Sequence, residues 1–292
     1  MPNDSIHIGT AGWSYEDWKG IVYPPDMPGT THPLELLSQW FDVVEVNSTF
    51  YRPPSARNCA SWVEKVADKP RFAFTVKLWQ RFTHERGSFP TDAEVRTYCD
   101  GIQPLVEAGR LGAILVQFPW SFKRTDANRR WLAAVMDAFA DYPLALEIRH
   151  SSWNRPEVFE GLAERQAAFC NIDQPLFRDS IAPSDKVTAR VGYVRLHGRN
   201  AQDWFREDAS RDERYDYLYS AEELSPWIEK IRAMRQRVNE LFVITNNHYR
   251  GQAVVNALEL GHALGGRKYA LPKHLVDEYP RLRELLMPRD TP

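Results

Sequence analysis

Residues 72–77 of the chain read FAFTVK, a short apolar run that ends in a lysine. Side chains two residues apart share one face of a strand, so Ala73 and Thr75 lie on the face of Lys77, and Phe74 lies on the other. This pattern places small residues in a crowded interior and large ones under a covering layer. Strands buried on both faces usually exclude charges. The mouth of a parallel barrel, where the strands end at an active site, accounts for the lysine.

Other short apolar runs end in polar residues in the same way. They are VVEVN, AILVQ, LALEIR and YVRLH, and their polar ends are Glu45 and Asn47, Gln117, Glu147 and Arg149, and Arg195 and His197. Asp173 follows a further run, and Asn246 and Asn247 follow the last one. We expect all these side chains to gather at one barrel mouth.

Strand-like runs alternate along the chain with longer helix-like segments, which is typical of a parallel sheet. The predicted strands are His7–Thr10, Val43–Asn47, Phe72–Lys77, Ala113–Gln117, Leu144–Ile148, Ala168–Ile172, Tyr193–Leu196 and Leu241–Thr245. The predicted helices are Pro33–Phe41, Cys59–Val66, Asp92–Ala108, Asn128–Ala140, Pro156–Arg165, Pro226–Asn239 and Gln252–Leu264. The pattern predicts an α/β fold, a TIM-type (β/α)8 barrel in which residues 1–292 form a single domain. An open doubly wound sheet is the rival, but the first strand is not followed by a glycine-rich phosphate-binding motif.

The composition excludes several classes of protein. Lys and Arg total 37 against 39 Asp and Glu, so no global charge attracts nucleic acid or an anionic membrane. No apolar run approaches the ~20 residues of a membrane span, and the N-terminus lacks the pattern of a signal peptide. Cys59, Cys99 and Cys170 are too widely spaced for a disulfide framework. We expect a cytoplasmic protein that does not bind membranes.

Several of these elements together resemble the YecE-like family, catalogued as domain of unknown function 72. They are GTAGWSY (Gly9–Tyr15), FDVVEVNSTFY (Phe41–Tyr51), FAFTVK (Phe72–Lys77), VQFPWSF (Val116–Phe122), LEIRHSSW (Leu146–Trp153), YVRLHG (Tyr193–Gly198) and TNNH (Thr245–His248). The chain departs from the family's pattern at Trp120, where a second proline is common. The resemblance implies a TIM barrel of uncharacterised activity. That fold has been likened to an AP endonuclease barrel, which raises a nucleic-acid role by analogy.

The polar residues at the predicted mouth suggest an enzyme site for a small anion. Glu45 and Glu147 are candidate acid/base groups, and His197 is a third. Lys77, Arg149 and Arg195 would hold the anion, and Asn47, Gln117 and Asp173 would orient it. The remaining candidates for ligand contact are Trp13, Tyr15, Tyr51, Trp153, Asn246 and Asn247. The alternative for the charged residues is an internal ion-pair network, and one of the two asparagines could cap a helix.

A mouth with one clear histidine and several cations is a poor metal site, so we expect neither a metal nor a cofactor. The leading hypothesis is an enzyme that acts on a small polar anionic metabolite, such as a sugar phosphate or a nucleotide-like compound. Its class would be hydrolase, lyase or isomerase with carboxylate acid/base chemistry. A nucleic-acid-binding or processing protein is one alternative, supported by an Arg-rich stretch between Arg195 and Arg214. A glycoside hydrolase that uses the two glutamates is another.

Overall fold

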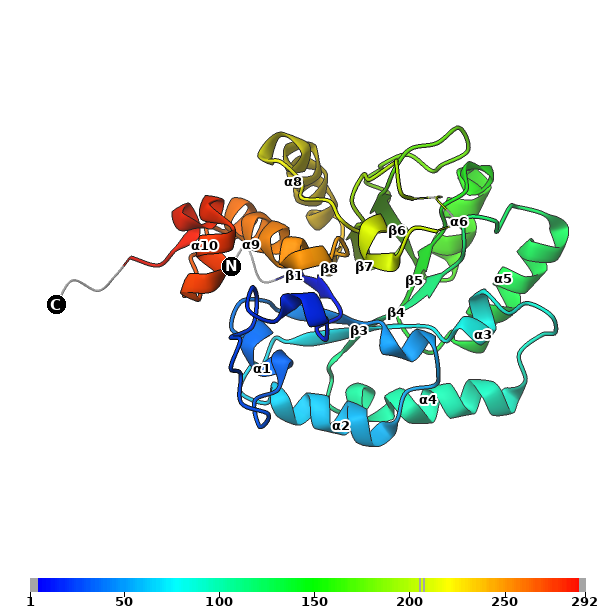
Figure 1. Ribbon diagram of the computed structural model, residues 1–292. Helices are drawn as coiled ribbons and strands as arrows, with labels where there is room; N and C mark the ends of the chain where they lie inside the picture. The colour runs from blue at the N-terminus through cyan, green and yellow to red at the C-terminus, as the bar shows by residue number, and fades with distance from the viewer. Residues whose placement is uncertain (1–4, 205, 207, 289–292) are drawn as a thin grey trace.

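The computed structural model describes residues 5–204, 206 and 208–288, and it is a closed barrel of eight parallel strands surrounded by helices (Figure 1). Each strand pairs with the next, and β1 closes the ring on β8. The strands are β1 (Ile6–Ala11), β2 (Val43–Val46), β3 (Ala73–Lys77), β4 (Leu111–Gln117), β5 (Leu144–Glu147), β6 (Ala168–Asp173), β7 (Val191–Leu196) and β8 (Glu240–Thr245). The predicted TIM-type barrel is confirmed.

The helices cover the outside of the barrel. They are α1 (Pro33–Leu37), α2 (Ala56–Lys65), α3 (Gln80–Thr83), α4 (Asp92–Glu107), α5 (Asp126–Ala138), α6 (Pro156–Glu164), α7 (Arg211–Arg214), α8 (Ala221–Arg235), α9 (Gln252–Gly265) and α10 (Lys273–Glu278). Short 3₁₀ helices lie at Glu16–Trp18, Ser48–Phe50, Ser151–Trp153, Tyr249–Gly251 and Pro280–Leu285. No helix of the described chain is both long enough and apolar enough to span a membrane.

The boundaries of two helices differ by four residues or more from those predicted. The predicted helix that starts at Pro226 begins five residues earlier as α8, because Ser220 caps it in a reciprocal capping box with Glu223. The predicted helix Pro33–Phe41 ends at Leu37, where α1 stops. The short helices α3, α7 and α10 had no apolar periodicity long enough to predict them.

The alternation of side chains along β3 follows the prediction. Thr75 faces the barrel interior, where the hydroxyl of Tyr193 lies 2.7 Å from its Oγ1. Phe74 faces outward and packs on Trp62 of α2, with ring centroids 6.3 Å apart. Lys77 has the parity of Thr75, so the backbone of β3 directs it into the interior at the strand's C-terminal end.

Close packing of α4 gives a prediction about two glycines. A Cβ on Gly101 in α4 would lie 2.1 Å from the carbonyl oxygen of Pro54, whereas a Cβ on Gly161 in α6 would meet nothing within 4 Å. We expect Gly101→Ala to lower the free energy of unfolding by about 1–3 kcal/mol. Gly161→Ala should raise it by about 0.5–1 kcal/mol because alanine favours helix. Urea unfolding of both variants measures this, and a stabilising Gly101→Ala would contradict the close approach.

Candidate functional site

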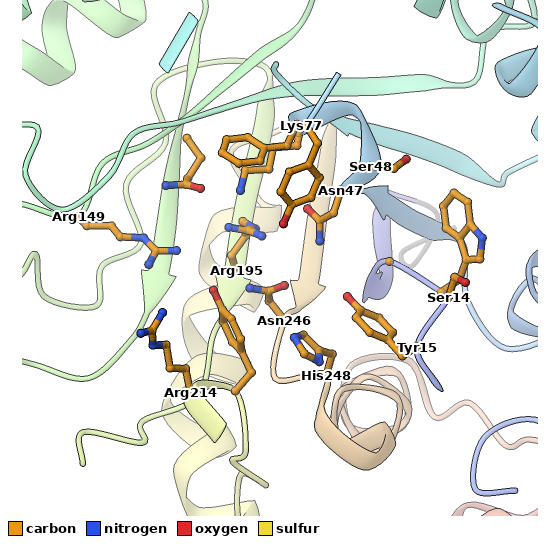
Figure 2. Close-up of a pocket in the computed structure, with 16 residues that line it drawn as sticks. Ser14, Tyr15, Asn47, Ser48, Lys77, Arg149, Arg195, Arg214, Asn246 and His248 are labelled. Carbon is orange, nitrogen blue, oxygen red and sulfur yellow. The ribbon is translucent and has the colours of Figure 1, made fainter. Parts of the chain in front are cut away.

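A cavity of about 570 Å³ opens at the C-terminal ends of the barrel strands. The predicted binding residues on its wall are Trp13, Tyr15, Asn47, Tyr51, Lys77, Gln117, Arg149, Arg195 and Asn246. Gly12, Ser14, Ser48, Phe50, Arg214, Tyr215 and His248 also line it and were not predicted as site residues. Figure 2 shows Arg149, Arg195 and Arg214 toward one side of this pocket and Ser14 and Tyr15 toward the other. We call this cavity the mouth pocket.

The floor of the mouth pocket rests on a buried network of charges centred on Arg195. Its guanidinium donates to Glu45 Oε1 over 2.6 Å through Nη2 and to Glu147 Oε2 through Nη1. Arg149 Nε donates to Glu147 Oε1 over 2.8 Å. The hydroxyl of Tyr193 donates to Glu45 Oε2 over 2.9 Å. Each oxygen of the two carboxylates is therefore held by at least one donor, as a buried charge requires.

The electrostatics of this network keep Glu147 ionised. Burial by itself would raise the pKa of Glu147, but the charge of Arg195, with smaller effects from His197 and Arg149, holds it well below its usual value. The same two glutamates raise the pKa of Arg195 well above its usual value although burial opposes this. Glu147 and Arg195 are therefore charged at neutral pH.

Glu45, Glu147 and His197 were predicted as catalytic groups, but they are not among the residues that line the mouth pocket. Each is fully buried, with an exposed fraction of 0%. The alternation of side chains along the strands correctly predicted that they point into the barrel. The longer side chains of Arg195 and Arg149 separate them from the mouth pocket. Glu45 and Glu147 hold Arg195 and Arg149 of the wall.

His197 is neutral and carries its proton on Nε2. Asn246 Nδ2 donates to His197 Nδ1 over 2.9 Å, which leaves Nε2 as the protonated nitrogen, 3.3 Å from Glu147 Oε1. Burial is the main reason that the pKa of His197 falls to about 3, and the arginines Arg149 and Arg195 add to the effect against the attraction of Glu147. His197 therefore fixes the amide of Asn246 at the pocket wall.

Lys77 differs from Arg149 and Arg195 because the described residues provide it with no carboxylate partner. Its Nζ lies 4.0 Å from the centroid of the Phe50 ring. Burial, followed by repulsion from Arg195, lowers the pKa of Lys77 to about 7, although Glu147 and Glu45 oppose this shift. An amine with this pKa can gain and lose a proton near neutral pH.

Aromatic rings line much of the remaining wall. The ring of Tyr15 stacks on His248 with centroids 4.4 Å apart and planes 11° from parallel. The guanidinium carbon of Arg149 lies 5.4 Å from the Trp204 ring centroid, which restricts the arginine's orientation. Tyr51, with 66% of its surface exposed, lies at the rim against Phe50. Such rings can stack on a planar or sugar-like ligand.

Three predicted binding residues lie away from the mouth pocket. Asp173 is buried on the outward face of β6 and accepts from Arg199 Nε over 2.8 Å. The parity that pairs Asp173 with Asn171 holds, but Asn171 Nδ2 donates to Lys186 O over 2.8 Å in the loop between β6 and β7. The prediction placed these two residues on the interior face of β6, whereas they lie on its outward face.

Trp153 and Asn247 also point into packed regions. Trp153 Nε1 donates to Phe122 O over 2.6 Å, and its ring stacks on Phe122. Asn247 Nδ2 donates to Tyr217 O over 2.7 Å and to Asn256 Oδ1 over 2.8 Å. Neither Asn246 nor Asn247 caps α9, whose N-cap is Gly251. These two predicted contacts are structural.

Two of the seven lining residues that sequence reasoning missed come from the long segment between β7 and α8. Arg214, at the end of α7, and Tyr215 reach the mouth pocket from this segment. Arg214 lies in the Arg-rich stretch noted in the sequence, where nothing distinguished it from its neighbours. Most of those neighbours are paired: Arg206 with Asp203, Asp208 and Glu213, and Arg199 with Asp173 and Glu223.

The charged side chains that line the mouth pocket are all basic. Lys77, Arg149, Arg195 and Arg214 line it, and no Asp or Glu of the described chain is among the lining residues. Within residues 5–204, 206 and 208–288, no group of three or more His, Cys, Asp or Glu side chains could hold a metal ion. The pocket is therefore suited to a small anion with polar groups.

Comparisons with known proteins agree with the fold. A family model described as "Protein of unknown function DUF72" matches residues 7–279. The UPF0759 protein YunF of Bacillus subtilis is 30% identical over 268 residues, which cover 87% of this chain and 93% of that protein. The UPF0759 protein YecE of Escherichia coli is 27% identical over 162 residues, 55% of this chain and 53% of that protein.

Solved structures extend the comparison to three dimensions. The crystal structure of a DUF72 family protein from Thermotoga maritima is 38% identical with a TM-score of 0.77, over 89% of this chain and 99% of that one. The crystal structure of a DUF72 family protein from Enterococcus faecalis is 26% identical with a TM-score of 0.78, over 92% of this chain and 98% of that one. These proteins share the barrel.

Proposed function

The chain belongs to the DUF72 family of proteins of unknown function, and we propose that it is an enzyme acting on a small polar anionic metabolite in the mouth pocket. A sugar phosphate or a nucleotide-like compound has the required chemistry. The observation that carries the proposal is the charge of the wall, which has four cationic side chains, Lys77, Arg149, Arg195 and Arg214, and no lining carboxylate among the described residues. Guanidinium groups bind phosphate and carboxylate oxygens in pairs, which gives orientation as well as affinity.

The arrangement supports catalysis as well as binding. Barrel enzymes carry their chemistry at the C-terminal ends of the strands, which is where the mouth pocket lies. A lysine with a pKa of about 7 in such a pocket is a functional-site signal, because a merely structural lysine is better placed where it stays charged. Lys77 and His248 are the groups on the wall that can transfer protons. Glu45 and Glu147 act indirectly, by holding Arg195 and Arg149 in place.

A glycoside hydrolase is less well supported. Its two carboxylates must face the sugar from both sides. Here Glu45 and Glu147 are fully buried and share one partner, Arg195. A nucleic-acid-binding protein needs cations that track a phosphate backbone. The described arginines of the stretch from Arg195 to Arg214 are mostly paired with acidic side chains, which leaves little charge for such a track.

A thermal-shift screen tests the proposed function. It compares phosphorylated sugars, nucleotides, oligonucleotides and divalent metals. A small anion present at ~100 times its Kd should stabilise the native chain by about 2.7 kcal/mol. For a chain of this size we expect the Tm to rise by roughly 5 °C or more.

Two arginine variants test whether the stabilising anion binds in the mouth pocket. Arg149→Met and Arg214→Met should each reduce the shift with a small anion. Arg237→Met is the matched control, because Arg237 forms an exposed ion pair with Asp185 outside the mouth pocket. A shift with oligonucleotides alone that disappears with salt would favour nucleic-acid binding instead. Equal shifts in all three variants would contradict an anion site at the mouth.

A further inference from the structure

The backbone of Lys77 is anchored to two neighbouring elements. Its carbonyl oxygen accepts from Thr49 Oγ1 over 2.6 Å and from the Tyr98 hydroxyl over 3.2 Å. These bonds join the end of β3 to the 3₁₀ helix Ser48–Phe50 and to α4. The same 3₁₀ helix brings the ring of Phe50 against the Lys77 ammonium. The backbone at Lys77 is therefore anchored, and its amine lies over the Phe50 ring at the pocket wall.

The surroundings of this amine oppose its charged form. The nearest buried carboxylates, Glu45 and Glu147, are already bound by Arg195, with Arg149 and Tyr193 occupying the remaining oxygens. The described residues offer Lys77 no ion pair. Burial and the charge of Arg195 bring its pKa to about 7, so about half of it is neutral at pH 7. An ordinary lysine has less than about one neutral amine in a thousand at that pH.

Lys77, Arg149, Arg195 and Arg214 all line the mouth pocket. In Figure 2, Lys77 and Arg214 lie on opposite sides of Arg195, and Arg149 lies on the side of Arg214. Arg149 and Arg214 can hold the anionic group of a ligand. Its other end would then reach the amine of Lys77.

We propose that Lys77 is a covalent nucleophile, which forms an imine with the aldehyde or ketone carbonyl of an anionic ligand held by Arg149 and Arg214. The inference rests on the proposed function and narrows its substrate class to anions that carry a carbonyl group. A lysine desolvated beside other cations is one of the ways in which proteins activate an amine for this attack. Lys77 would then be a catalytic residue.

The chemical step balances without any further reagent. The neutral amine attacks the carbonyl carbon, the C–N bond forms, and the carbonyl oxygen takes up a proton to give a carbinolamine. The C–O bond then breaks, and the oxygen leaves as water. Overall, one ammonium and one carbonyl give one iminium and one water, with both lost amine protons on the departing oxygen. The positive charge of the iminium can then attract electrons from the adjacent carbon of the ligand.

Reductive trapping tests the proposal on the full chain. The protein is incubated at pH 7 with D-glyceraldehyde 3-phosphate or with D-glyceraldehyde, and cyanoborohydride reduces any imine to a stable amine. Peptide mass analysis then gives the rate of labelling at each lysine. Lys123 and Lys273, which are exposed, are the internal controls. We expect Lys77 to be labelled by the phosphorylated aldehyde at least about tenfold faster than either control.

Further variants test whether the labelling of Lys77 depends on the anion site. Arg149→Met and Arg214→Met should reduce labelling of Lys77 by the phosphorylated aldehyde, and inorganic phosphate should compete with it. Arg237→Met, at an exposed arginine outside the mouth pocket, should leave labelling by both aldehydes unchanged. Lys77→Met removes a charge that has no partner among the described residues. This variant should therefore fold normally, and it should lose the fast label.

Each contrary result has a distinct meaning. Labelling of Lys77 at the rate of Lys123 and Lys273, with the thermal shift by small anions retained, would overturn the imine proposal and leave the proposed function standing. Loss of both effects would overturn both. Equal labelling of Lys77 by the two aldehydes would separate the amine from the anion site and contradict the proposal.

Discussion

Replacing Arg195 with methionine is expected to lower the free energy of unfolding at pH 7 by about 3–5 kcal/mol, because the change leaves two buried carboxylates without their shared cation. Glu45 and Glu147 are fully buried, and the Arg195 side chain is 2% exposed, so water cannot replace the lost partner. Urea unfolding followed by circular dichroism measures the change.

Two further variants separate this cost from a simple loss of packing. The triple variant Glu45→Gln, Glu147→Gln, Arg195→Met should recover much of the stability, because it removes the buried charges together. Arg237→Met breaks an exposed ion pair with Asp185 and should cost less than about 1 kcal/mol. A single Arg195→Met change as mild as this control would show that the network contributes little to the barrel.

Replacing His197 with glutamine is expected to make stability less dependent on pH between 7 and 5. Burial lowers the pKa of His197 to about 3 in the folded protein. In the unfolded chain the imidazole takes up a proton below its ordinary pKa of about 6.5, which favours unfolding as the pH falls toward 3. At pH 5 this should cost about 2 kcal/mol relative to pH 7, and His197→Gln should remove that part of the loss.

Glutamine preserves the neighbouring contacts, since its oxygen can accept from Asn246 and its amide can donate to Glu147. The low pKa of Glu147 affects stability mainly below its ordinary range, so it contributes little between pH 7 and pH 5. Urea unfolding at the two pH values gives the comparison. An unchanged pH dependence in His197→Gln would mean that the folded protein protonates His197 and pairs it with Glu147.

The barrel could be predicted because each strand carries its signal locally. Short apolar runs with charged ends, such as that of Lys77, mark both the strand and the end at which it opens. Helix boundaries were less predictable where two signals competed. Pro226 is a common first residue of a helix, but the capping box of Ser220 and Glu223 lies upstream and starts α8 earlier.

The alternation of side chains predicted which site residues point into the barrel, but not how deeply each one is buried. Alternation pointed Glu45, Glu147 and Arg195 into the barrel, but the alternation pattern does not show that the arginine covers the two glutamates. For Asp173, the alternation showed that it shares a strand face with Asn171, but not whether that face points into the barrel or toward the helices. Arg214 reaches the mouth pocket from the segment between β7 and α8, and no strand pattern specifies the path of such a segment.

Calorimetric titration with D-ribose 5-phosphate, set against D-ribose, tests the anion site most directly. We expect one phosphorylated sugar to bind per chain, with a Kd that rises about tenfold in Arg149→Met and in Arg214→Met and is unchanged in Arg237→Met. D-Ribose should bind far more weakly than its phosphate. Equal affinity for the two sugars, or equal affinity in all the variants, would contradict the assignment of the mouth pocket as an anion-binding site.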